Sequence, residues 1–332
     1  MTDHPTLRVL VVAGAVGVAL LAMPYLLAAY PLTILSHMLV MSIACLGLNV
    51  LYGTAGSLSL GHAMFFGVAA YAGAFLYRFS TVESLELYLL SGVICSTLLA
   101  AAIGFVCVRT TRIFFAILTL ALSMMVYSLF INGAIFRLFG GLGWALYLLG
   151  GGAMFLPRLT ILGAVFAPHA FAVALYYTIA AAFLATALIL WRIGGSPFGQ
   201  ALRAIRENDT RAAFVGIPVW QYRWSAFVLS GFFVGLAGAL YGLLARQITP
   251  EQLHWLFSGQ LVFATVLGGT RHFLGPVLGA LVFVWLDEVA SRWVVGRYAT
   301  FGALLIIVVF AFPRGIAGGL AALVGTVKKF RS

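Results

Sequence analysis

Polar side chains and glycines interrupt an apolar stretch at residues 47–73, GLNVLYGTAGSLSLGHAMFFGVAAYAG. Amide, hydroxyl and imidazole groups can exchange hydrogen bonds with a small polar solute, and a helix broken by glycine opens backbone groups to that solute. The same residue types also allow helices to pack closely, with the polar side chains hydrogen-bonded inside the protein. Both interpretations stay open. The first one predicts that a solute path is lined by Asn49, Gly53, Gly56, Ser57, Ser59 and His62.

A second polar stretch, residues 192–223, holds seven of the 27 charged residues and lies between two uncharged runs. Ser196-Pro197 is typical of a helix start, and Gly216-Ile-Pro218 is typical of a helix end. Between them, apolar residues recur near helical spacing, which predicts a short amphipathic helix. Such a helix either lies in lipid headgroups or inserts into a groove of a partner protein. Glu207 and Asp209, placed among the arginines, favour the partner protein.

Motifs for catalysis are missing from the sequence. There is no GxxxxGK[ST] nucleotide-binding motif, no HExxH metal motif and no GxSxG nucleophile motif. Asp287 and Glu288 are the only adjacent acids, and the three cysteines have no spacing for zinc. We therefore expect no enzyme activity, no catalytic residue, no metal and no cofactor.

The composition is that of an integral membrane protein, with 63% hydrophobic residues, 8% charged residues and a mean hydropathy of +1.10. No charged residue occurs between Arg8 and Arg78, or between Arg158 and Arg192. A helix of about 20 apolar residues crosses a bilayer, so we expect an all-α polytopic membrane protein with about 8–10 transmembrane helices, some broken or re-entrant. Residues 1–332 form a single transmembrane domain in this interpretation. The expected spans are 9–29, 32–52, 59–77, 87–108, 113–133, 168–191, 224–245, 258–270, 274–290 and 298–313.

Ten crossings put both termini on the same side of the membrane. If that side is the cytoplasm, 13 arginines and lysines face inward and 6 face outward, which is the bias of the positive-inside rule. The rule therefore predicts that both termini and residues 192–223 are cytoplasmic. Anionic lipid headgroups and topology then explain the net charge of +11, and no nucleic-acid partner is expected.

A stripe of small residues marks the span at 224–245. Its glycines are spaced by four, three and four residues, which places them on one helix face where another backbone can approach closely. We expect a helix-packing role for Gly231, Gly235, Gly238 and Gly242.

Four segments together resemble the LivM-type permease subunits of branched-chain amino acid ABC importers, the LivH/LivM family. They are the 47–73 segment, GQALRAIRENDTRAAFVGIPVWQYRWSAFVLSGFFVGLAGALYG at 199–242, LGGTRHFLGPVLGA at 267–280 and FPRGIAGG at 312–319. The resemblance runs in order over about 45–330, and the 199–242 block is its most specific part. It implies a permease domain in which residues 192–223 form a cytoplasmic coupling loop.

The resemblance also implies partners. Such a permease works in the bacterial inner membrane with a second, LivH-type permease, two ABC ATPase subunits and a periplasmic solute-binding protein. The coupling helix, by similarity Ala204–Ala213, receives the motion of an ATPase. The residues implied in this coupling are Arg203, Arg206, Glu207, Asn208 and the loop glycine Gly216.

Branched-chain amino acids are the default substrate that the resemblance implies. Members of the family often carry a polar TGGSDGL-like stretch where this chain reads FGGLGWAL, at 139–146. Permeases for urea or short-chain amides are therefore an alternative. An ion-coupled secondary transporter is a second alternative, although such carriers usually need an acid within the membrane, and none lies inside a confidently placed span.

Overall fold

The computed structural model describes residues 5–80, 83–110, 113–138, 152–156 and 167–291, with single residues or short runs at 160, 163 and between 299 and 319. Helices dominate these residues, which confirms the all-α membrane class. The elements are α1 (Pro5–Leu26), α2 (Ala29–Asn49), the π-helix η1 (Val50–Thr54), α3 (His62–Ser80), α4 (Leu85–Cys107), α5 (Ile113–Ile131), α6 (Ala134–Leu138), β1 (Met154–Phe155), α8 (Pro168–Gly195), α9 (Pro197–Glu207), α10 (Asp209–Phe214), α11 (Val219–Ala245), β2 (Gln247–Ile248), the 3-10 helix η2 (Pro250–Leu253), α12 (Trp255–Gly268) and α13 (Gly275–Ser291).

Several helices have the length and composition of membrane spans. Within the described residues, five are long and apolar enough to cross a bilayer: α2 continued by η1, α4, α5, α8 and α11. Shorter apolar helices, α12 among them, lie beside them. The expected span at 298–313 falls mostly outside the described residues.

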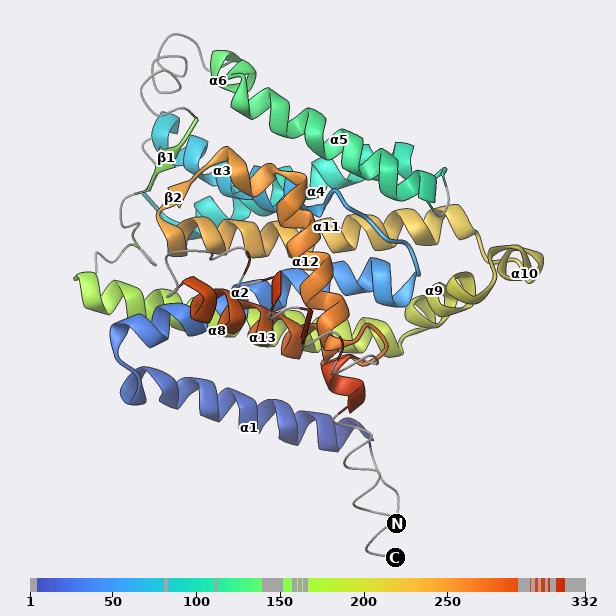
Figure 1. Cartoon of the computed structure of the whole chain (residues 1–332), viewed down its shortest axis with the longest axis horizontal. Coiled ribbons are helices and arrows are strands. Elements are labelled where there is room, and N and C mark those ends of the chain that lie inside the picture. Colours follow the sequence, from blue (N-terminus) through green and yellow to red (C-terminus); the bar gives the residue numbers. More distant parts are fainter. Residues whose placement is uncertain are drawn as a thin grey trace, which may run out of the picture.

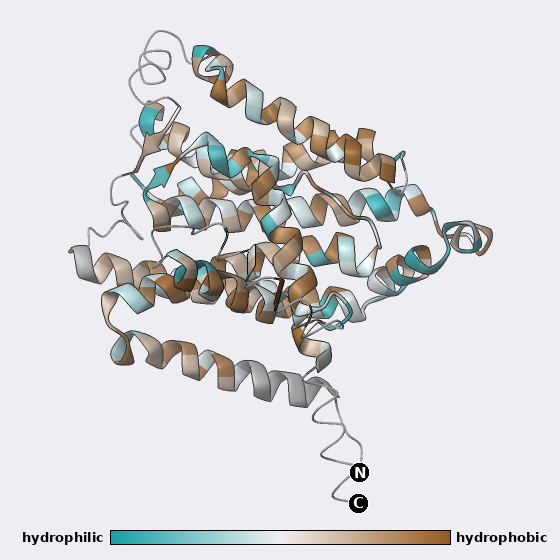
Figure 2. Ribbon diagram, viewed as in Figure 1, coloured by the Kyte–Doolittle hydropathy of each residue, from teal (hydrophilic) through white to brown (hydrophobic). Residues whose placement is uncertain are grey.

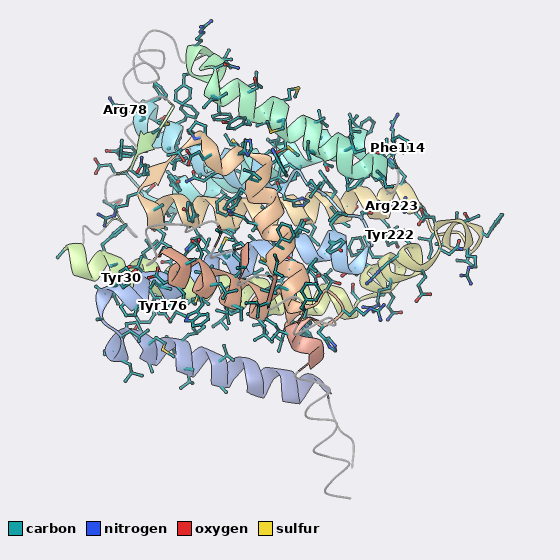
Figure 3. All side chains as sticks on the ribbon, in the orientation of Figure 1. Tyr30, Arg78, Phe114, Tyr176, Tyr222 and Arg223 are labelled. Carbon is teal, nitrogen blue, oxygen red and sulfur yellow. The ribbon has the colours of Figure 1, made fainter. Side chains whose placement is uncertain are left out.

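The long helices run roughly side by side, and α11 lies at the centre of the bundle (Figure 1). It packs against α2, α3 and α4, while α8 and α13 pack on α2. The helices α9 and α10 project from one end of the bundle, and hydrophilic residues gather there (Figures 1 and 2). Tyr222 and Arg223 lie at this end, whereas Tyr30 and Arg78 lie at the opposite end (Figure 3).

Close approach to α11 occurs along its glycine stripe. A Cβ at Gly231 would collide with the Cβ of Ala100 in α4, and one at Gly238 would collide with the backbone of Phe66 in α3. Gly235 and Gly242 face Ser96 and Tyr88 of α4 in the same way, and all four glycines are buried. The sequence spacing thus corresponds to contacts with two neighbouring helices.

The end opposite α9 and α10 carries a pair of two-residue antiparallel strands, β1 and β2, in which Met154 pairs with Ile248. Neither strand falls within an expected span, and the sequence did not predict their pairing. Residues 139–146, where the sequence departs from the family pattern, lie outside the described residues.

Candidate coupling and translocation site

The 47–73 segment contains the helix break that its glycines predict. After Asn49 the chain widens into the π-helix η1, in which the Ala55 amide bonds the Val50 carbonyl at 3.2 Å. Residues 55–61 then run without helix, and α3 begins at His62, three residues later than the expected span. Gly56 has φ of +74°, a conformation in which glycine avoids the steric cost that other residues meet.

Side chains from distant helices satisfy the backbone amides beyond the break. The Leu60 amide donates to the Thr119 hydroxyl of α5 at 3.3 Å, and the Ala63 amide donates to the Ser258 hydroxyl of α12 at 2.7 Å. Buried amides without partners would be costly inside the bundle. These bonds therefore fix the end of the non-helical segment against α5 and the first turn of α3 against α12.

His62 is a fully enclosed polar residue at the end of the break. It is 0% exposed, with Nδ1 2.9 Å from the Ser59 hydroxyl and Nε2 2.8 Å from the Ser230 hydroxyl of α11. The rings of Phe65 and Phe227 meet it edge-on. Both ring nitrogens are thus engaged inside the protein, and neither His62 nor Ser59 lines a described cavity.

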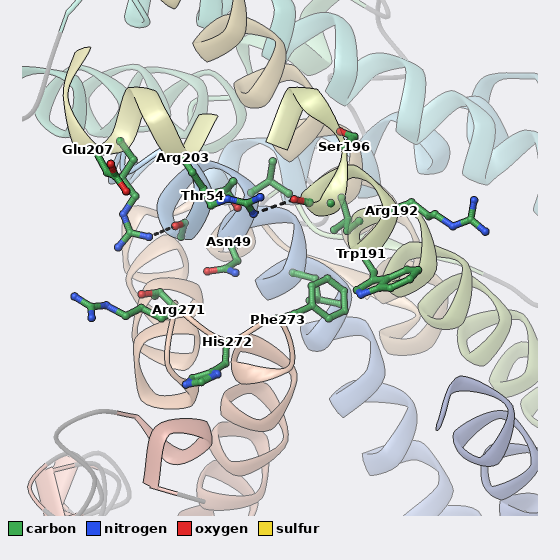
Figure 4. A pocket seen from close by; sticks show the side chains of 18 residues that line it. Asn49, Thr54, Trp191, Arg192, Ser196, Arg203, Glu207, Arg271, His272 and Phe273 are labelled. Atoms are coloured by element: carbon green, nitrogen blue, oxygen red, sulfur yellow. Dashed lines mark hydrogen bonds between the residues drawn. The ribbon is translucent and has the colours of Figure 1, made fainter. Parts of the chain in front are cut away.

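A cavity of about 940 Å³ opens between the break, the end of α8, α9 and the turn at 270–273 (Figure 4). Asn49, Gly53 and Thr54 form its wall on the side of the break. The Asn49 Oδ1 atom is buried and has no hydrogen-bond partner within the described part of the chain. This oxygen has almost no exposed surface and packs against Gly53, so it must turn before it can meet a small polar ligand in the cavity.

A smaller cavity of about 380 Å³ lies on the other side of Arg206, where Gly56 and Ser57 face Asn208 and Asp209 of the loop. The path residues inferred from the sequence therefore occupy three places. Asn49 and Gly53 line the larger cavity, Gly56 and Ser57 line the smaller one, and the remaining two are enclosed in the bundle.

The loop at 192–223 folds into two helices, α9 and α10. The prediction of a single coupling helix over Ala204–Ala213 is therefore wrong. Asn208 is extended, with φ of −161°, and its side chain accepts the Arg211 amide at 2.9 Å. Asparagine is a strong N-cap residue and starts α10 here instead of continuing α9. Ser196 caps α9 as expected, accepting the Gly199 amide at 3.4 Å.

The residues that the resemblance assigned to coupling have different surroundings in the fold. Arg203 donates to the Gly194 carbonyl at 2.9 Å, and Arg206 donates to the Gly53 carbonyl within the break. Glu207 lines both cavities, and Gly216, with φ of +86°, follows α10. Asn208 serves α10 as its cap.

Two apolar residues at the tip of the loop escaped the sequence analysis. Phe214 is 86% exposed and Val215 is 77% exposed; they are the last residue and the C-cap of α10, a helix that projects from the bundle (Figure 1). Their signal in the sequence was a pair of large apolar residues directly before Gly216. Exposed apolar side chains on a projecting polar element are typical of a contact with a protein or with lipid headgroups.

The chain matches the family described as "Branched-chain amino acid transport system / permease component" over residues 30–312. The LivM proteins of Salmonella typhimurium and Escherichia coli, both named as permeases of high-affinity branched-chain amino acid transport, are each 23% identical to it over 95% of this chain and 76% of their own length. The guanosine ABC transporter permease NupQ of Bacillus subtilis is 35% identical over 32% of this chain and 34% of its own length. No solved structure matches significantly. The chain belongs to the branched-chain amino acid transport permease family, as a multi-pass membrane subunit of an ABC importer that works with other subunits and is not itself an enzyme.

Proposed function

We propose that this subunit forms part of the path by which branched-chain amino acids cross the bacterial inner membrane. The larger cavity carries the proposal, because it joins the helix break to the coupling loop and combines an unpaired Asn49 oxygen with the apolar side chains of Leu46, Trp191 and Phe273. An aliphatic amino acid needs that combination of apolar and polar surface. A second permease of the LivH type then completes the path.

Separate ATPases drive this transport through residues 192–223, which we place in the cytoplasm together with both termini. Four features of the loop support this role: it projects from one end of the bundle, carries charged side chains, exposes Phe214 and Val215, and contacts the wall of the larger cavity through α9. The full assembly contains the two permeases, two ATPase subunits and a periplasmic solute-binding protein.

The alternatives have weaker support. Urea and short-chain amides would use the amide of Asn49 but leave the apolar side chains without a partner group. Other relatives are named as permease proteins for guanosine and for autoinducer 2 import, so similar permeases are associated with solutes of other kinds. An ion-coupled carrier needs an acid within the membrane, whereas Asp287 and Glu288 lie in the last turn of α13, and Glu288 accepts the Tyr30 hydroxyl at 2.6 Å.

Reconstitution tests the proposal directly. The tagged chain is expressed with a LivH-type permease, the ABC ATPases and a solute-binding protein from the same genome, and the purified complex is placed in liposomes. We expect uptake of radiolabelled leucine that requires ATP and the binding protein, with urea as the competing solute. Uptake of leucine by this chain alone along an ion gradient would overturn the proposal that ATPases drive transport. Transport of urea in place of leucine would overturn the assignment of the substrate.

A further inference from the structure

We propose that Arg206 is a positioning residue that ties α9 to the π-helix η1, so that it carries motion of the loop into the wall of the larger cavity instead of contacting an ATPase. The inference rests on the proposed function, because the ATPases must be what moves the 192–223 loop. Arg206 is one of the residues that the resemblance assigned to the ATPase interface, and the fold turns it toward the break.

The head of Arg206 is held by a carbonyl that the break sets free. In a continuing α-helix, the Gly53 carbonyl would accept the amide of Ser57. Here the Ser57 amide bonds the Leu51 carbonyl at 3.1 Å, and the Arg206 Nη1 atom donates to the Gly53 carbonyl. The guanidinium therefore takes the place of a backbone donor within the π-turn.

The stem of Arg206 is held by the second glycine of the break. A Cβ atom at Gly56 would lie 2.6 Å from Arg206 Cγ and 3.3 Å from its Cβ, so the aliphatic stem occupies the space that any other residue at 56 would fill. Head and stem together span the break from Gly53 to Gly56. On the same helix, Leu202 and Ile205 are 0% exposed, so the turn of α9 that carries the arginine is held against the rest of the chain.

The residues tied in this way are those that shape the cavity. Gly53 lies in its wall with Asn49 and Thr54, and the Asn49 Oδ1 atom is buried without a partner. A π-turn often lies at a functional site, because a shift of one residue changes which carbonyls are paired. Asn49 Oδ1 packs against Gly53, so a displacement of α9 that pulls on the Gly53 carbonyl shifts this oxygen relative to the cavity.

Arg203 provides a matched control on the same helix. Its Nη1 atom also donates to a backbone carbonyl, that of Gly194, but this carbonyl belongs to the end of α8 beside α9 and not to the break. Both arginines are exposed and both line the larger cavity. Replacement of either by methionine removes one charge and one hydrogen bond while keeping an apolar stem of similar length.

The test follows the cavity wall and needs no solute. Thr54→Cys is introduced with Cys95→Ser, which removes an exposed native thiol, and the complete complex with its ATPases is placed in nanodiscs. The rate of labelling by a charged maleimide is measured without nucleotide and with ATP and vanadate. We expect the rate to change at least about fivefold, the lower end of ordinary allosteric coupling. Arg206→Met should abolish this change while the ATPases stay bound and hydrolyse ATP, and Arg203→Met should keep it.

Arg206→Lys provides a second variant, because a flexible ammonium replaces the planar fork at one carbonyl only; we expect it to reduce the change. If the methionine variant is not recovered from membranes, the lysine variant decides. The inference is overturned if the Arg206 variants keep the full change, if Arg203→Met abolishes it as well, if the parent shows none, or if Arg206→Met releases the ATPases. A wild-type complex that contains no ATPase refutes the proposed function itself.

Discussion

At the scale of single residues, His62 shows how a polar group in a membrane helix can serve the fold. Both of its nitrogens meet hydroxyls, one from Ser59 three residues earlier in the chain and one from Ser230 of α11. Residue type alone could not separate this role from solute binding, since an imidazole in a span is suited to either. What decides the contact is Ser230, which is 168 residues away in the sequence.

His62→Phe should destabilise the protein, because it removes one hydrogen bond from the Ser59 hydroxyl, which keeps the Gly61 amide, and leaves the buried Ser230 hydroxyl without its partner, at a cost of about 1–3 kcal/mol. Thermal unfolding of the purified protein in detergent measures this as a lower Tm. Asn49→Ala is the control, since the Asn49 oxygen has no described partner to lose, and its Tm should stay near that of the parent. A His62→Phe protein with unchanged Tm and no transport would assign His62 to the path.

At the scale of elements, the coupling loop shows what the sequence can and cannot predict. Ser196-Pro197 predicted the start of α9, and the glycines of 47–73 predicted the helix break, because both signals are local and steric. Asn208 was missed as a cap, because the helical pattern runs on across it. The π-turn and the two-residue strands carry no periodic signal, and the cavity depends on helices brought together from distant segments.

Phe214→Ser should weaken the association of the permease with its ATPases by about tenfold or more, as removal of an exposed anchor of about 1.4 kcal/mol would. The side chain is 86% exposed, so its loss removes little packing within the chain. Co-purification of the ATPases at graded salt concentrations provides the measurement. Thr210→Ser, at another exposed position of α10, is the control and should bind normally; equal binding by Phe214→Ser would remove α10 from the interface.

At the scale of the whole molecule, α11 organises the bundle. It contacts α2, α3 and α4 and lies between the loop end and the strand end. Its glycine stripe predicted close packing but not the partners, because small-residue spacing says which face approaches and nothing about what it approaches. Phe66 on α3 and Ala100 on α4 are positioned by the tertiary fold.

Gly238→Ala should lower stability by about 1–3 kcal/mol, the usual cost of overpacking, because its Cβ would meet the backbone of Phe66, which cannot rotate away. Gly259→Ala in α12 is the matched control, with no atom within 4 Å of the added Cβ. Tm and the fraction of monodisperse protein after extraction measure both. If the two alanine variants are equally stable, α11 is not closely packed at Gly238.

The salt bridge between Arg223 and Asp209 joins the first turn of α11 to α10, and the last turn of α11 leads directly into β2. A helix of 27 residues is about 40 Å long, so one stiff rod connects the two faces of the membrane. If α11 couples binding at one face to binding at the other, the two affinities are linked reciprocally. By whatever factor a ligand at the strand end changes the affinity of α10 for its partner, that partner changes the affinity for the ligand by the same factor.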